Sequence, residues 1–298
     1  MAVDLGYDES GSGDVLIVSA QGGVSEQVRG MNRLWKQRLR SLKYFHSKEF
    51  NNLSYGIFTD TGLDRSARKA LLRDLSKLIR RHLLFSVTAS VSLKEYETLT
   101  TPAFRSRMGT AYGFLIDMCM LLAHARCEIE FGYKSEFNML VEQGHRNAEQ
   151  VAQILAIVSK IPEELLPLPI KLLTTGLGKK EDHPVLQAAD MAAYSHWQSW
   201  NNGDSTIWKA LYKPGNRYRS WAVKCDKELI RTFVEGPEAP KQFVLQQKAL
   251  MQSDALHGSE LEIPEIQGSD GGHSESTTHG SSEEVGLGES GKGEKAEH

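Results

Sequence analysis

The sequence contains few of the features that mark secreted or membrane-spanning proteins. Among its 298 residues only three are cysteines, too few and too scattered for a disulfide framework or a cysteine-based zinc site. The acidic N-terminus has no basic stretch followed by an apolar one, which a secretory signal would need. The longest apolar run, 111–125, is shorter than the roughly 20 residues of a membrane span, and it contains Asp117. We therefore expect a cytoplasmic protein without membrane contact, in which this run is a buried helix.

Aromatic residues are missing from the end of the chain, where acidic residues gather. Residues 252–298 hold 11 acidic residues, 2 lysines, 9 glycines and 8 serines, whereas residues 1–251 carry a formal net charge of +6. A segment of this composition cannot bury enough apolar surface to offset the entropy that it would lose on ordering. The sequence thus predicts one folded domain over 1–251 and a disordered acidic tail over 252–298.

Hydrophobic periodicity over the first 251 residues predicts an α/β fold. Residues 3–8 and 14–20 are expected to form a β-hairpin around the loop 9–13, and later strands alternate with helices. Ser25 and the pair Asn147 and Gln150 are candidate helix caps. The further strands are predicted at 83–93, 137–144 and 170–175, and the helices at 25–42, 64–82 and 104–125, after 147 and from Pro184. This order predicts a mixed sheet that opens with a β-hairpin and is covered by helices.

Three acids occupy positions from which side chains can converge. Asp8 closes the first predicted strand, Glu142 closes a later one, and Asp190 lies in an alanine-rich helix that can approach the sheet closely. Strand ends and the helix crossing them are common places for a site in α/β proteins. Two carboxylates 4 Å apart repel by about 4 kcal/mol at an effective dielectric constant of 20, and Mg²⁺ or Mn²⁺ would remove that cost. The alternative is that each acid is a solvated turn residue.

Two short motifs in this order resemble a known family. Asp8-Glu9-Ser10-Gly11 and Leu186-Gln187-Ala188-Ala189-Asp190 resemble the signature motifs of an uncharacterised microbial family, domain-of-unknown-function family 3800, which is grouped with the ribonuclease H-like superfamily. Residues 45–50, with His46 before Glu49, resemble the family's middle motif, and Glu142 stands where the family has an acid that closes a strand. The resemblance covers about residues 3–201, so 202–251 would be a helical and loop extension.

The resemblance implies a ribonuclease H-like fold with a carboxylate cluster for two divalent ions. Asp8, Glu142 and Asp190 would be the metal ligands and Glu49 a fourth, and the usual reaction of such a site is phosphodiester hydrolysis. His46 has two interpretations: it passes a proton to the leaving group, or it packs between its phenylalanine neighbours. Glu9 is expected to be a loop residue facing solvent, or to reach the second metal through water.

Basic residues interleaved with aromatic ones predict contacts with nucleic acid. The segment 213–224 combines cations with rings that can stack on unpaired bases, and its candidate residues are Lys213, Arg217, Tyr218, Arg219 and Trp221. A second basic stripe lies opposite the predicted apolar stripe of the helix 64–82 and is either a phosphate contact or a solvated face. Its residues are Lys69, Arg73, Lys77 and Arg80.

The function favoured by the sequence is a metal-dependent phosphodiesterase, specifically a nuclease. The alternative is a non-catalytic module that binds nucleic acid or protein on the same fold, since Glu142 replaces the shorter aspartate of the family and His145 follows it closely. An enzyme for small phosphorylated substrates ranks lower, because the chain has no glycine-rich phosphate loop. DNA or RNA preference, endo- or exonucleolytic cleavage and oligomeric state are not determined by any of these features.

Overall fold

The computed structural model describes residues 2–40, 42–51, 63–132, 135–144, 147–160, 168–202, 206–212 and 218–257. Two of the predicted nucleic-acid contacts, Lys213 and Arg217, lie outside these residues, as does His145. The predicted tail lies outside them from residue 258 onward. Its first six residues, 252–257, were wrongly assigned to disorder, because they form the end of helix α11 (Ala239–His257).

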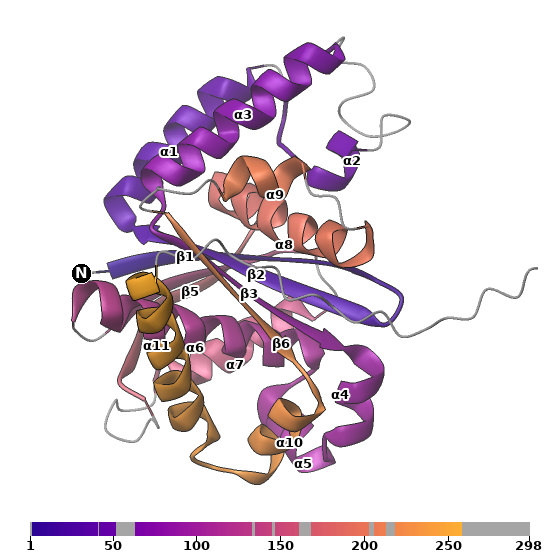
Figure 1. Cartoon of the computed structure of the whole chain (residues 1–298), viewed down its shortest axis with the longest axis vertical. Coiled ribbons are helices and arrows are strands. Elements are labelled where there is room, and N and C mark those ends of the chain that lie inside the picture. Colours follow the sequence, from indigo (N-terminus) through magenta and orange to yellow (C-terminus); the bar gives the residue numbers. More distant parts are fainter. Residues whose placement is uncertain are drawn as a thin grey trace, which may run out of the picture. The chain divides into compact units, whose positions relative to one another are not determined.

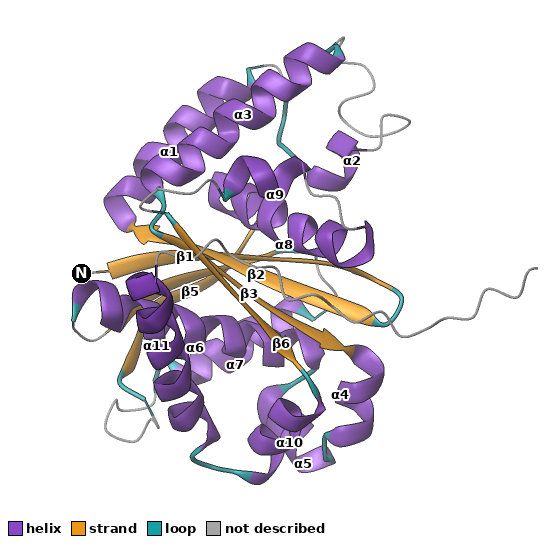
Figure 2. Ribbon diagram, in the orientation of Figure 1, coloured by secondary structure: helices purple, strands orange, loops and turns teal. Residues whose placement is uncertain are grey.

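A mixed sheet of six strands forms the centre of the described chain, in the order β5-β4-β1-β2-β3-β6 (Figures 1 and 2). Neighbours β1/β2 and β2/β3 are antiparallel, while β1/β4, β4/β5 and β3/β6 are parallel, so β2 alone runs against the others. The strands are β1 Ala2–Ser12, β2 Val15–Val24, β3 Phe85–Ser92, β4 Ser135–Glu142, β5 Ile170–Gly178 and β6 Arg219–Cys225. The predicted α/β fold and its opening hairpin are confirmed.

Helices cover both faces of this sheet (Figure 1). On one face α1, α3, α8 and α9 share a hydrophobic core, and on the other α6 packs with α4, α5, α7, α10 and α11. Their bounds are α1 Ser25–Leu39, α2 Ser47–Asn51, α3 Arg65–His82, α4 Leu93–Leu99, α5 Pro102–Met108, α6 Ala111–Phe131, α7 Ala148–Val158, α8 Pro184–Asn202, α9 Thr206–Leu211 and α10 Lys227–Glu235. Side chains of β1 therefore alternate between two cores, with Tyr7 facing α6 and Asp8 facing α8.

The first hairpin is longer than predicted. β1 continues through residues 9–12 of the expected loop 9–13, and the pairing with β2 runs from Val3↔Val24 to Ser12↔Val15. The turn is therefore only Gly13-Asp14, and Gly13 has a φ of +62°, which suits glycine. The Gly/Ser composition of 9–13 was misleading because these residues extend against the apolar strand β2, which supplies the backbone hydrogen bonds.

The apolar segment predicted as one helix over 104–125 is two helices. α5 and α6 are separated at Gly109, whose φ of +79° is incompatible with a continuous helix. Among the described helices, none alone is long and apolar enough to cross a membrane, and α5 with α6 would meet that test only as a pair bent by 59°.

Two of the predicted helix caps, Ser25 and Asn147, do not make the expected capping hydrogen bonds. Ser25 is the first residue of α1 and its hydroxyl donates to Asp4 (2.6 Å) instead of capping the helix. Asn147 precedes α7 but makes no side-chain capping bond. By contrast, Asp64 caps α3 by accepting from the Ala67 N–H (2.7 Å), next to the predicted start.

Helix α3 buries a stripe that differs from the predicted one, Leu71, Leu75, Leu78 and His82. The buried residues are Leu72, Leu75, Ser76 and Ile79. The helix is thus rotated slightly about its axis, because it packs against both α1 and α9 rather than against one partner.

The extension 202–251 is more than helices and loops. Its residues 219–225 form β6, which pairs in parallel with β3 from Phe85↔Arg219 to Val91↔Cys225. The sheet core therefore continues past the region covered by the family resemblance, and the α6 face is completed by α10 and α11.

Candidate functional site

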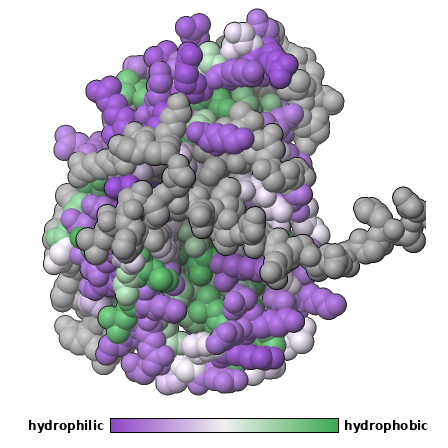
Figure 3. Space-filling model, viewed as in Figure 1, coloured by the Kyte–Doolittle hydropathy of each residue, from purple (hydrophilic) through white to green (hydrophobic). Residues whose placement is uncertain are grey.

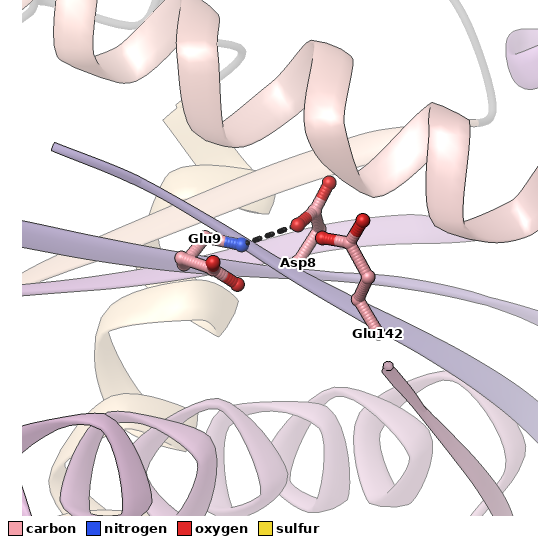
Figure 4. A group of neighbouring side chains, drawn as sticks. All are labelled: Asp8, Glu9 and Glu142. Carbon is pink, nitrogen blue, oxygen red and sulfur yellow. Dashed lines mark hydrogen bonds between the residues drawn. The ribbon is translucent and has the colours of Figure 1, made fainter. Parts of the chain in front are cut away.

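The parallel pairing of β1 with β4 and of β4 with β5 ends at one edge of the sheet, while β1 itself continues to Ser12. The last pair between β1 and β4 is Tyr7↔Val141, so the next residues, Asp8 and Glu142, stand side by side on the face covered by α8. Figure 4 shows their carboxylates on the same side of the sheet, below a helix. The two acids converge because parallel strands in register present equivalent residues on the same face.

Helix α8 brings the third predicted acid to this edge. A Cβ added to Gly6 of β1 would lie 2.9 Å from side-chain carbons of Val185, which shows how closely α8 approaches the strand. The helix contains buried alanines whose small side chains permit close packing, namely Ala188, Ala189, Ala192 and Ala193. Asp190 lies in the same helix and is only 4% exposed. The predicted convergence of Asp8, Glu142 and Asp190 is thus present.

A lysine that we did not predict lies among these three acids. Lys180, in the connection from β5 to α8, places its Nζ 2.8 Å from Asp8 Oδ2, 3.1 Å from Asp190 Oδ1 and 3.2 Å from Glu142 Oε2. Its side chain is 10% exposed. Three N–H groups of one ammonium thus face three carboxylates, each on a different element.

The charges at the site shift the pKa values of its members. Burial raises the pKa of Asp8 well above its ordinary value, the ammonium of Lys180 opposes that shift, and the carboxylates of Glu142 and Asp190 add to it. Burial alone would lower the pKa of Lys180, but the three carboxylates outweigh it and raise this pKa. The lysine is therefore held charged, while the acids around it exceed it in number.

Glu9 belongs to this site, contrary to the expectation that it is a solvent-facing loop residue. It lies within β1 and is half-buried, and its carboxylate oxygens come within 4.8 Å of ligand oxygens of Asp8 and Glu142. Its backbone N–H donates to Asp8 Oδ1 (2.8 Å; Figure 4). Burial, followed by the charge of Glu142, raises the pKa of Glu9 to about 7.

The middle motif reaches the same edge through His46. Its Nδ1 lies 3.0 Å from Glu49 Oε1 and its Nε2 3.6 Å from Asp190 Oδ1, so the ring stands between two carboxylates. The alternative packing between its phenylalanine neighbours is not found, because the Phe45 and Phe50 rings contact each other in a tilted arrangement with centroids 5.1 Å apart. Glu49 thus meets the cluster through the imidazole.

Gln187 holds the parts of this site together. Its Oε1 accepts from Trp35 Nε1 (2.8 Å) and from the Phe45 N–H (2.7 Å), and its Nε2 donates to the Lys180 carbonyl (2.6 Å). The side chain is 1% exposed. One amide therefore fixes α1, the segment before His46 and the backbone that carries Lys180.

The donor set at this edge suits a hard divalent cation. Asp8, Glu9 and Glu142 offer only carboxylate oxygens, which Mg²⁺ and Mn²⁺ prefer. Within the described part of the chain, Glu9 Oε2 is buried and accepts no hydrogen bond. A buried carboxylate oxygen without a donor is costly, and a cation would satisfy it.

The aromatic members of the predicted nucleic-acid interface are not free to stack on bases. Tyr218 is buried, stacks on Tyr212 and donates to Gln21 Oε1 (2.6 Å). Trp221 is half-buried and donates to Gln247 Oε1 (2.8 Å). Of the three members that the structure describes, Arg219 alone is exposed, at the start of β6, and this strand lies three strands away from β1, about 14 Å at the usual strand spacing. The expectation that Tyr218 stacks on a base is therefore wrong.

The basic stripe on α3 is largely a surface feature. Lys69, Arg73 and Lys77 are exposed, whereas Arg80 is half-buried and donates to the Ala210 carbonyl. The surface over α1 and α3 is mostly hydrophilic in the view of Figure 3. Both interpretations of this stripe, a phosphate contact or a solvated face, are compatible with that exposure.

A comparison with models of known protein families finds no match for this chain, and a comparison with curated proteins finds none either. The resemblance of the motifs at 8–11 and 186–190 to a family stays a prediction. Asp8, Glu9, Glu142, Lys180 and Asp190 together form a carboxylate–lysine site, and its geometry is what indicates a function for this chain.

Proposed function

We propose that this chain is a cytoplasmic metal-dependent phosphodiesterase, and specifically a nuclease, built on a ribonuclease H-like fold. The observation that carries the proposal is the carboxylate–lysine site itself. Carboxylates from β1, β4 and α8 converge where the parallel pairing of β1, β4 and β5 ends, and a single ammonium leaves most of their charge uncompensated. Buried acids gathered at such a cost are a feature of functional sites rather than of stable cores.

A bound Mg²⁺ or Mn²⁺ would be held by Asp8 and Glu142 with Glu9 or Asp190, and would polarise a phosphate oxygen and lower the pKa of a bound water. The chain's own groups have separate roles. Lys180 attracts any anion that enters the cluster, and His46 stands at the rim, where it is 28% exposed and oriented by Glu49. His46 is thus placed to protonate a leaving oxygen.

Exposed cations lie on the two segments that border the acids. Lys43 and Lys48 flank His46, and Lys179 precedes Lys180. A 3.4 Å ion pair between Lys43 and Glu181 joins these segments. Such a rim would attract a phosphate backbone toward an acidic centre that would otherwise repel it, which supports nucleic acid as the partner.

The non-catalytic alternative is favoured by one observation, the lysine. Because Lys180 already pairs with Asp8, Glu142 and Asp190, the cluster does not need a metal in order to be stable. A module that binds nucleic acid or protein without cleaving it would then retain the fold. This alternative predicts that neither Mg²⁺ nor Mn²⁺ binds at the site.

The test compares a buried aspartate, Asp190, with a half-buried one, Asp117, on the opposite face of the sheet. The full chain is incubated with single- and double-stranded DNA and RNA in Mg²⁺, Mn²⁺ or EDTA, beside the variants Asp190→Asn and Asp117→Asn. We expect cleavage that needs the metal, is lost in Asp190→Asn and survives in Asp117→Asn, whose carboxyl lies on α6. Cleavage retained by a folded Asp190→Asn protein would refute the proposal.

A further inference from the structure

Lys180 occupies a position that resembles a cation site. Its Nζ is bounded by oxygens of Asp8, Glu142 and Asp190 at 2.8–3.2 Å. These ligands come from a strand, a neighbouring strand and the crossing helix, so no two of them share a local turn. An ammonium with three N–H groups is saturated by three such acceptors.

Hydrogen bonds to the backbone around Lys180 hold this residue in position. Its backbone carbonyl accepts from Gln187 Nε2 (2.6 Å), and the turn around it is closed by bonds from the Asp182 and His183 N–H groups to the Lys179 carbonyl (both 3.1 Å). Ordering a lysine side chain costs conformational entropy. Burying its ammonium adds a cost of desolvation, which ion pairs offset only when their geometry is good. The turn supplies that geometry.

A second group of oxygens lies beside the lysine and does not include Asp190. Asp8, Glu9 and Glu142 have ligand oxygens within 4.8 Å of one another, while one oxygen of Asp190 contacts Lys180 and the other accepts from the Ser47 N–H (2.7 Å). Asp190 is therefore held by the chain's own cation and a backbone N–H. Asp8 and Glu142 contact Lys180 through Oδ2 and Oε2 and also belong to the group with Glu9, so they can be shared between Lys180 and a cation from solution.

We propose that Lys180 takes the place of one of two divalent ions, so that the site binds a single Mg²⁺ or Mn²⁺ on Asp8, Glu9 and Glu142. The inference rests on the proposed function and specifies its site. Two-metal sites hold ions about 3.5–4 Å apart over one phosphate, and the lysine ammonium would provide one of those two charges permanently. The substrate would be a phosphodiester held by the bound ion, with the charge of Lys180 nearby.

The test counts ions rather than activity. Mn²⁺ is titrated by calorimetry into the full chain, Lys180→Met, Lys180→Arg and a reference variant, Asp8→Asn/Glu142→Gln. The acidic segment 252–298 is the same in all four proteins, so its own Mn²⁺ binding cancels when the reference is subtracted. We expect one site-bound ion in the natural sequence and in Lys180→Arg, and two in Lys180→Met.

The outcomes separate this inference from the proposed function. Two ions in the natural sequence, or equal numbers in it and in Lys180→Met, would overturn the role of Lys180 and leave a metal-dependent site intact. No ion above the reference in any variant would overturn both. Should Lys180→Met not fold, the electron paramagnetic resonance spectrum of the natural sequence decides: isolated Mn²⁺ supports the inference, and a spin-coupled Mn²⁺ pair overturns it.

Discussion

Two clusters of buried polar side chains lie next to each other on the α8 face of the sheet, and they are built differently. The carboxylate–lysine site gathers acids around one cation. The neighbouring cluster is neutral: Ser19 bonds Thr88 (2.6 Å), Gln21 donates to Ser86 (2.8 Å), and Tyr218 donates to Gln21 (2.6 Å). In the neutral cluster donors and acceptors match, whereas the charged one has an excess of acceptors. Matched networks specify a fold, and an unmatched one indicates a ligand.

The largest effect that we expect is the loss of cleavage when one acid of the carboxylate–lysine site is removed. For Asp8→Asn we expect metal-dependent cleavage to fall by about 10³-fold or more, because loss of even an outer-shell partner commonly costs 10–100-fold. The free energy of unfolding without metal should not decrease, since burial and like charges already disfavour the ionised Asp8. Initial cleavage rates and urea unfolding check both. A variant that loses stability instead would place Asp8 among structural residues.

Replacing Lys180, unlike replacing Asp8, should lower the free energy of unfolding. Lys180→Met leaves three carboxylates without their shared ammonium, and we expect a loss of about 3–5 kcal/mol in EDTA. Mn²⁺ should restore more stability to this variant than to the natural sequence. Lys171→Met is the matched control, because the Lys171–Glu136 pair (2.9 Å) is exposed and should contribute no more than about 1 kcal/mol. Equal losses in the two variants would contradict the electrostatic account of the site.

Gln187 links the charged site to the core, so its replacement should affect both stability and function. Gln187→Leu would leave the Trp35 indole N–H and the Phe45 N–H buried without an acceptor, at about 1–3 kcal/mol each, and would free the Lys180 turn. We expect a loss of about 3–4 kcal/mol together with weaker Mn²⁺ binding. Gln247→Leu breaks a similar bond to Trp221 and should lower stability alone. Unchanged Mn²⁺ affinity in Gln187→Leu would mean that Gln187 only packs the core.

Much of the charged site could be predicted from sequence because its acids are placed by regular elements. Asp8 and Glu142 lie on neighbouring parallel strands, directly after the last pair between them, Tyr7↔Val141, and Asp190 lies on an alanine-rich helix. Lys180 was missed because its role depends on a chain reversal after β5 that no periodicity encodes. The available signal was the pair Lys179-Lys180, five residues before the motif that begins at Leu186. Glu9 was missed because glycine and serine after it suggested a loop, whereas pairing with β2 extends the strand.

The neutral cluster could not be predicted, because each of its bonds joins distant parts of the chain. Tyr218 and Gln21 are 197 residues apart, and Gln21 and Ser86 are 65 apart. An aromatic residue between arginines therefore looked like a stacking residue, although it packs into the sheet face. Alternation within one strand predicts which side chains are buried, but not which partner a buried polar group will find.

Asp117, on the opposite face of the sheet, tests how burial changes the pKa of an acid outside the carboxylate–lysine site. Asp117 lines a cavity of about 240 Å³ with Arg107, and burial raises its pKa to about 6, opposed by the Arg107 charge. Because the folded state favours the protonated form, this contribution to stability is complete below pH 4 and is lost as the pH rises through 6. Between pH 4 and 7 the natural sequence should lose about 2–3 kcal/mol relative to Asp117→Asn, measured by urea unfolding. Parallel pH profiles would show that Asp117 has an ordinary pKa.

The smallest effect is expected in the neutral cluster. Tyr218→Phe removes the donor to Gln21 Oε1 and leaves that buried acceptor unpaired, at about 1–2 kcal/mol. Tyr96→Phe, which removes a hydroxyl bonded to the Gly109 carbonyl (3.0 Å), is a control of the same chemistry on the other face. Both should lower stability alike and leave Mn²⁺ binding and nucleic-acid affinity unchanged. Weaker nucleic-acid binding by Tyr218→Phe alone would show that this cluster also contacts the ligand, and matched hydrogen bonding would then no longer distinguish a structural network from a functional one.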